Sequence, residues 1–181
     1  MSGKQRKRSR KTAKDNGTRM ETAVESYLQW ALDDPRIQRL RLHGSKDIGD
    51  IGNVYWHGQP VCIEVKWTQT MDAPQHMREA VTEAGNMDSP YPWVIQKRAG
   101  VGLTSMHKLG QQHAYTVTEV MDAMLRLSPS ALRARIKPEP LGRKKTMCLI
   151  TLQEFALILN SGLPLGHSGS MPSEVSNQSE E

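Results

Sequence analysis

Cysteines, aromatic residues and long apolar runs are scarce in this chain of 181 residues. The sequence has two cysteines, one phenylalanine and six scattered histidines. Cys62 and Cys148 cannot build a disulfide framework and have no metal-ligand spacing. No run approaches the roughly 20 apolar residues of a membrane-spanning helix, and the basic N-terminus lacks the apolar stretch of a signal peptide. These absences argue against a disulfide-rich secreted protein, a zinc finger and a membrane protein, and they predict a cytoplasmic location.

Positive charge is concentrated at the N-terminus. Residues 1–16 carry seven basic side chains and one acid, Asp15, whereas the chain after Gly162 has three glutamates and no lysine or arginine. We therefore expect a disordered basic tail at 1–16 and a disordered acidic tail at 162–181, on either side of a domain at 17–161. A basic tail favours binding to nucleic acid through release of counterions; the alternative is an arm that only increases solubility. The seven basic residues are Lys4, Arg6, Lys7, Arg8, Arg10, Lys11 and Lys14.

Hydrophobic periodicity predicts the order α-β-β-β-α-β in the domain, followed by α, β and α. This order indicates a mixed sheet flanked by helices and places the chain in the α/β class. Thr18 is expected to cap the first helix, and the segment 33–35 is expected to end it. Helices are expected at 19–33, 73–85, 117–127 and 152–159, and strands at 37–42, 50–56, 60–67, 92–95 and 146–150.

The strand at 60–67 carries the residues of greatest chemical interest. Side chains alternate between the two faces of a strand, so Glu64 and Lys66 share the face opposite to the buried apolar residues. On its own, a Glu-x-Lys pair on the solvent side of a strand is typically a surface salt bridge. Asp50, at the start of the partner strand, supplies a second acid that changes this interpretation.

The register of the hairpin between these strands decides whether Asp50 joins the face of the Glu-x-Lys pair. A two-residue turn at 57–58 sets Asp50 opposite Val65, on the wrong face. A three-residue loop at 57–59 sets Asp50 opposite Lys66, and the glycine in this loop permits the left-handed conformation that such loops use. We therefore expect the three-residue loop, with both acids and the lysine converging.

Two carboxylates and a lysine suit a hard cation. Mg²⁺ prefers oxygen ligands and is often held by one or two carboxylates together with a phosphate. The metal polarises a phosphoryl oxygen and lowers the pKa of its bound water, and the lysine adds positive charge where negative charge develops. We expect Mg²⁺, with Mn²⁺ as a substitute, at Asp50 and Glu64. Asp47 is the rival to Asp50, which is preferred because it directly precedes the strand.

Asp50 followed by Glu64-Val65-Lys66 resembles the signature of PD-(D/E)xK nucleases, with Gly49 where the motif has proline. Residues 17–21 (Gly-Thr-Arg-Met-Glu) resemble the start of the first helix in Holliday junction resolvases of the archaeal type.

Further segments carry the same resemblance. Residues 41–45 (Arg-Leu-His-Gly-Ser) resemble the loop before the metal-binding aspartate of those resolvases. Residues 79–86 and 94–98 are similar to phage-encoded resolvase-like nucleases of this superfamily. The resemblance covers about residues 17–105 and implies a restriction-endonuclease-like sheet flanked by helices.

The resemblance also implies a role for each matching residue. Asp50 and Glu64 would bind the metal directly, with the carbonyl of Val65 as a third ligand. Lys66 would orient or activate the attacking water. Glu21 would join the catalytic group from the first helix.

Glu21 has a competing interpretation. Thr18-x-x-Glu21 is also a capping box, in which the glutamate reaches back to a backbone N–H at the start of the helix. Glu25, one turn further on, is the rival to Glu21 for the catalytic role.

Four residues are expected to bind DNA. Lys97 and Arg98 end a short strand and suit the scissile or an adjacent phosphate; the alternative is a solvated strand end. The resemblance of residues 41–45 to the resolvase loop implies that Arg41 contacts DNA. Ser45 is expected to contact a phosphate, or to serve only in a turn.

The resemblance implies a Mg²⁺-dependent DNA endonuclease that resolves four-way (Holliday) junctions in phage recombination or replication, in the cytoplasm of the host cell. Because resolution needs two symmetric cuts, we expect a homodimer. One alternative is a nuclease of the same superfamily that acts on ends, flaps or duplex DNA. The other is a non-catalytic DNA-binding protein with this fold.

Overall fold

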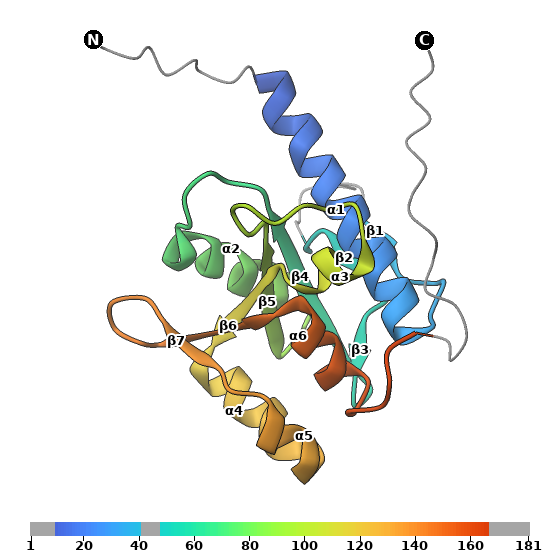
Figure 1. Ribbon diagram of the computed structural model, residues 1–181. Helices are drawn as coiled ribbons and strands as arrows, with labels where there is room; N and C mark the ends of the chain where they lie inside the picture. The colour runs from blue at the N-terminus through green and yellow to red at the C-terminus, as the bar shows by residue number, and fades with distance from the viewer. Residues whose placement is uncertain (1–9, 41–47, 167–181) are drawn as a thin grey trace.

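A mixed sheet with helices on both faces forms the part of the chain that the computed structural model describes, residues 10–40 and 48–166 (Figure 1). The helices are α1 (Arg10–Leu32), α2 (Ala73–Asn86), α3 (Met106–Gly110), α4 (Thr118–Leu127), α5 (Ser130–Arg135) and α6 (Leu152–Leu159). The strands are β1 (Gln38–Arg39), β2 (Ile51–Gly52), β3 (Tyr55–Trp56), β4 (Gln59–Lys66), β5 (Tyr91–Gln96), β6 (His113–Val117), β7 (Glu139–Leu141) and β8 (Met147–Thr151).

One crossover connection makes the sheet mixed. The strand order is β1-β2-β4-β5-β6-β8-β7, and β3 also pairs with β4. β4 and β5 run parallel, with Val65 opposite Ile95, while the other strand pairs of the described chain are antiparallel. A parallel pair needs a long crossover, which α2 supplies here. The predicted α/β class is confirmed, and the predicted strand at 50–56 is present as two short strands, β2 and β3.

The first helix is longer than the sequence pattern indicates. It begins at Arg10, so residues 10–16, expected in the basic tail, belong to α1. Lysine, arginine and alanine are good helix formers, which is why the helix extends beyond its apolar stripe. Thr18 lies inside the helix, so the predicted cap there is wrong. The predicted end is confirmed, because Asp33 has a φ of 52°, outside the helical region.

The second half of the sheet contains elements that no sequence pattern predicted. These are α3, β6, α5 and β7. β6 is a central strand, hydrogen-bonded to β5 on one side and to β8 on the other. Its five residues are too few to show a period, and its pairing partners are distant in the sequence.

The two faces of the sheet bury separate sets of side chains. On one face, α1, α4 and α6 pack around the Trp93 and Phe155 rings, whose centroids lie 4.3 Å apart. On the other face, α2 packs Met77 against Val94. β4 is covered on both sides, as strands of parallel pairs usually are. Glu64 is therefore largely shielded from water, with 7% of the residue exposed, whereas Lys66 on the same face is partly buried.

Several predictions fall on residues outside the described ranges. These residues are the expected DNA contacts Arg41 and Ser45, the rival acid Asp47, and the tail residues 1–9 and 167–181. Within the described ranges, no helix combines the length and the apolar character that crossing a membrane requires.

Candidate functional site

The hairpin that leads into β4 turns in two residues, so the predicted three-residue loop is wrong. Trp56 pairs with Gln59 across the turn. Further along the same hairpin, Ile51 pairs with Ile63. Between these two pairs, the incoming strand has one residue more than β4, which is a β-bulge. Asn53 lies in this stretch with a φ of 62°, a left-handed conformation that asparagine tolerates.

The extra residue of the bulge shifts the strand pairing so that Asp50 lies beside Glu64, and the sequence did not indicate this bulge. With the two-residue turn alone, Asp50 would lie opposite Val65 and face away from Glu64. Instead, its backbone N–H donates to the carbonyl of Ile63 at 2.8 Å. Its carboxylate accepts the backbone N–H of Val65, with 2.8 Å between Oδ2 and N. The convergence of the two acids is present, although the predicted register is not.

The backbone conformation at Gly49 is one that proline cannot adopt. Its φ is 88°, whereas proline is restricted to a φ near −65°. A Cβ at this position would lie 3.0 Å from the carbonyl oxygen of Ile63 and 3.2 Å from the sulfur of Cys62. The backbone before Asp50 therefore passes too close to β4 for a larger residue.

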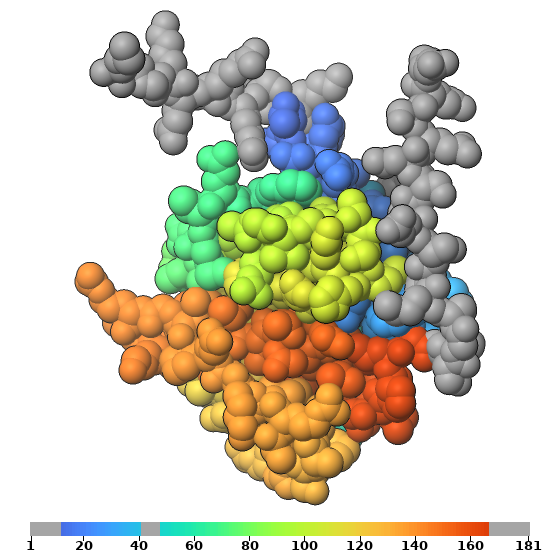
Figure 2. All heavy atoms as spheres, viewed as in Figure 1, coloured from blue at the N-terminus to red at the C-terminus, as the bar shows by residue number. Residues whose placement is uncertain are grey.

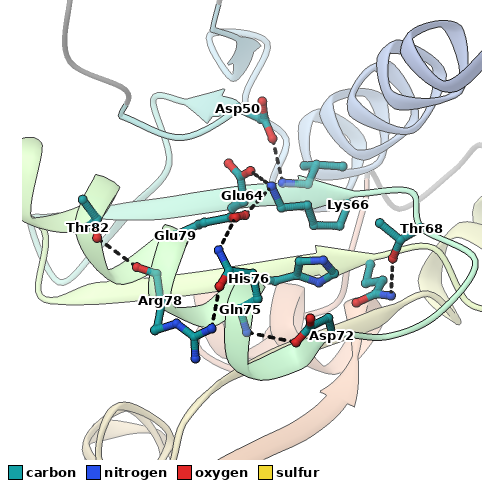
Figure 3. Close-up of polar contacts among 12 residues, drawn as sticks. Asp50, Glu64, Lys66, Thr68, Asp72, Gln75, His76, Arg78, Glu79 and Thr82 are labelled. Carbon is teal, nitrogen blue, oxygen red and sulfur yellow. Dashed lines mark hydrogen bonds and ion pairs between the residues drawn. The ribbon is translucent and has the colours of Figure 1, made fainter. Parts of the chain in front are cut away.

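Lys66 joins two carboxylates from different elements (Figure 3). Its Nζ donates to Glu64 on the same strand and lies 2.9 Å from Oε2 of Glu79 on α2. Burial disfavours the charged amine, but hydrogen bonds and charge attraction from both glutamates outweigh burial and raise the pKa of Lys66. The side chain is therefore cationic at neutral pH and acts as a fixed positive charge rather than as a base.

The surroundings of partly buried Asp50 and buried Glu64 disfavour the charged forms of both acids. Burial, followed by the charge of Glu64, raises the pKa of Asp50 to about 8. Burial, followed by a hydrogen bond with Glu83 on α2, raises the pKa of Glu64 to about 7, although Lys66 opposes the shift. Buried carboxylates in mutual contact favour a proton or a cation between them.

Glu79 and Glu83 are the site residues that sequence reasoning missed. They lie four residues apart on α2, so they share one face of that helix. Glu79 contacts Lys66, and Glu83 is 7% exposed and hydrogen-bonds Glu64. The spacing was visible in the sequence. That α2 turns this face toward β4 follows from the crossover between β4 and β5, which the spacing does not reveal.

Glu21 lies near the site but is held by another partner. Its Oε2 accepts from Nη2 of Arg39 at 2.6 Å and from Nε at 3.0 Å. Glu25 accepts the backbone N–H of Arg39 at 3.1 Å, which ties α1 to β1. After burial and Glu64, the charge of Glu21 is a further contribution to the raised pKa of Asp50. Glu21 therefore lies within electrostatic reach of Asp50, and its direct catalytic role stays a prediction.

The two described candidates for DNA binding lie at the end of β5. The backbone N–H of Lys97 donates to the carbonyl of Lys66 at 2.9 Å, so Lys97 is next to the site. Its Nζ donates to the carbonyl of Arg98 at 2.7 Å, and burial lowers the pKa of Lys97. Arg98 is exposed, and its backbone N–H donates to Oε1 of Gln112 at 2.8 Å. Their contact with DNA stays a prediction.

The donor set fits a cation that is held by few protein ligands. In the described ranges, no group of three or more His, Cys, Asp or Glu residues is arranged to hold a metal. Asp50 and Glu64 supply two hard oxygen ligands. Burial is the main cause of their raised pKa values, and a nearby cation would favour their ionised forms. Mg²⁺ commonly binds one or two carboxylates and completes its shell with water and phosphate. Val65 contacts Asp50 through its N–H; ligation by its carbonyl stays a prediction.

Comparison with known proteins gives no relative: no family model matches the chain, and no curated protein or solved structure is significantly similar to it. The function of this chain is therefore inferred from its site.

Proposed function

We propose that this chain is a Mg²⁺-dependent DNA endonuclease that hydrolyses phosphodiester bonds and prefers four-way junctions. The observation that carries the proposal is the hydrogen bond from the Val65 N–H to the Asp50 carboxylate, which puts Asp50 beside Glu64 and Lys66. The antiparallel strands β1, β2 and β4, followed by α2 and by β5 parallel to β4, also support a restriction-endonuclease-like sheet.

Each residue of the cluster has a distinct task in this proposal. Asp50 and Glu64 hold the cation, and when bound, Mg²⁺ polarises a phosphoryl oxygen and lowers the pKa of its water. Lys66 stays protonated, so it orients the attacking water by hydrogen bonding and balances charge as the phosphorane develops. Glu79 positions the Lys66 amine from α2. The water attacks phosphorus in line with the leaving oxygen, so one P–O bond forms as the other breaks. The water gives its proton to solvent, and the leaving oxygen takes a proton from solvent.

The preference for junctions requires two active sites. A four-way junction is resolved by two cuts at symmetry-related positions, and a two-fold dimer provides them. We therefore include a homodimer in the proposal.

Cleavage of a labelled four-way junction beside a linear duplex, with Mg²⁺ or with EDTA, tests the function. We expect paired nicks in the junction that need Mg²⁺ and are lost in Glu64→Gln. Asp122→Asn is the matched control, because it neutralises an exposed carboxylate on α4, outside the cluster. Equal cutting of both substrates would support the nuclease function and contradict the preference for junctions. Tight binding without metal or cleavage would indicate a DNA-binding protein instead.

A further inference from the structure

A pocket of about 310 Å³ lies at the end of the parallel strands β4 and β5. Trp67, Gln96, Lys97 and His113 form much of its wall. Trp67 follows Lys66 in the chain, and Gln96 is the register partner of Lys66 across the sheet. The pocket therefore begins one residue beyond the proposed catalytic cluster. Its volume is at the lower end of the range for small-molecule sites.

Two cations lie over the indole ring of Trp67. The guanidinium carbon of Arg19, on α1, lies 5.8 Å from the ring centroid, and Nζ of Lys97 lies 5.6 Å from it. Among the described residues, neither cation forms a salt bridge. Lys97 instead donates to the carbonyls of Arg98 and Val101. Positive charge without a local acid attracts phosphate groups.

Gln96 in the pocket wall is only 2% exposed, so the half-buried His113 is the group suited to the edge of a flat heterocycle. The Gln96 amide is fixed, because its Nε2 donates to Thr68 at 3.1 Å and its Oε1 accepts from the Tyr115 hydroxyl at 2.9 Å. The ring of His113 forms no hydrogen bond with another residue of the described chain. A neutral histidine presents one donor and one acceptor. An aromatic wall and a polar edge are thus combined with nearby cations.

We propose that this pocket receives one nucleobase of a DNA strand that has left the duplex. The base stacks on Trp67 in the place of the Lys97 amine, which moves from the ring to a flanking phosphate, while Arg19 attracts the neighbouring phosphate. The inference rests on the proposed nuclease function and deepens it, since it places an unpaired base next to the cleaved phosphate. An indole accepts any base, because every base has a π-face. A base inside a continuous duplex is stacked and paired and does not enter. The enzyme thereby distinguishes branched or single-stranded DNA from duplex DNA.

Two single strands that differ only in their bases test this proposal. One is an oligothymidine of about ten nucleotides, and the other is the same strand with abasic central positions. Binding of the full chain is measured in EDTA, so that no strand is cut. We expect the wild type to bind the base-bearing strand about tenfold more tightly than the abasic strand, which is the scale of one base–aromatic stack. Trp67→Ala is expected to bind both strands equally, and Trp67→Phe to keep most of the preference.

Two further variants separate stacking from a loss of folding. Ala99→Leu adds bulk at an exposed position of the pocket wall and leaves Trp67 in place, so we expect it also to abolish the preference. Trp30→Ala removes another half-buried indole, on α1 outside this pocket, and is expected to keep the preference. Equal binding of both strands by the wild type, or a preference that survives in Trp67→Ala, overturns the pocket assignment. Because cleavage is measured separately with Mg²⁺, a base preference without cleavage overturns the nuclease proposal, and cleavage without a base preference overturns only the pocket.

Discussion

The carboxylate of Asp50 accepts a hydrogen bond from the backbone N–H of Val65, with 2.8 Å between the two atoms. This bond joins the start of β2 to the middle of the Glu-Val-Lys segment of β4. It brings a second acid to Glu64. Burial raises the pKa of both acids, helped by the charge of Glu64 at Asp50 and by Glu83 at Glu64. The hydrogen bond therefore links the backbone geometry of the hairpin to the raised pKa values of the two acids.

Mg²⁺ is expected to stabilise the wild-type chain but not the variant Asp50→Asn or Glu64→Gln. A ligand at about 100 times its dissociation constant adds about 2.7 kcal/mol to the free energy of unfolding. For a chain of this size that corresponds to a rise in Tm of roughly 5–10 °C. Thermal unfolding with Mg²⁺ or EDTA measures it. Asp122→Asn should respond like the wild type, and an equal Mg²⁺ response in Glu64→Gln would contradict the assignment of the site.

Lys66→Ala is expected to lower kcat by about 10²-fold or more, because it removes a charge that faces the developing phosphorane. Glu79→Gln leaves that charge but loosens its position, so we expect a smaller loss, on the order of tenfold. Single-turnover cleavage measures both. Glu119→Gln, on the exposed side of α4, is the control for Glu79. A loss in Glu79→Gln as large as that in Lys66→Ala would show that Glu79 does more than position the amine.

Gly49→Pro would strengthen the resemblance to the nuclease signature and is nevertheless expected to abolish cleavage. The φ of 88° at Gly49 is outside the range of proline, so Asp50 would move and the chain would lose more than about 1 kcal/mol of stability. Gly49→Ala should also destabilise the chain, and more than Gly58→Ala does. Both glycines have positive φ, but only the Cβ at Gly49 would approach another backbone atom, at 3.0 Å. Chemical denaturation compares the three variants, and an active Gly49→Pro would refute this account.

The stability of the chain is expected to fall below about pH 6.5 in part through His113. Burial, followed by the charge of Arg98, lowers the pKa of His113 in the folded state. The unfolded chain, with a histidine pKa near 6.5, therefore binds more protons as the pH falls, and stability decreases in that direction. His113→Gln should lose less stability than the wild type between about pH 7.5 and pH 5. Urea denaturation at the two pH values measures the difference, and equal losses would exclude this role.

A two-fold dimer is expected in solution, with or without a four-way junction. α4 and the segment from β8 to α6 are the candidate surfaces. Leu127, at the end of α4, is 58% exposed, although most apolar residues of this helix are at least partly buried. Sedimentation of the full chain measures the oligomeric state. A monomer both free and bound to a junction would contradict the paired-cut model.

Local sequence patterns predicted the elements of the first half well. The apolar stripe of α1, the helix α2 and the alternation in β4 are each repeated over enough residues to show a period, and β5 was predicted from a short apolar run. Asp50, Glu64 and Lys66 were also predicted together, because a strand alternates its faces and the second acid stands just before the partner strand. The physical basis in each case is local: side-chain direction is a property of the backbone of a single element.

Tertiary structure alone decided how those residues meet. The bulge at Asn53 and the turn in two residues are compensating deviations, and either one alone would have turned Asp50 away from Glu64. The burial of Glu64 and the contribution of α2 depend on the crossover between β4 and β5. β6 depends on hydrogen bonds to two strands that are distant in the sequence. Residue identity thus determined which acids and cations are available, whereas pairing between distant segments set their spacing and burial, because those depend on which backbones lie side by side.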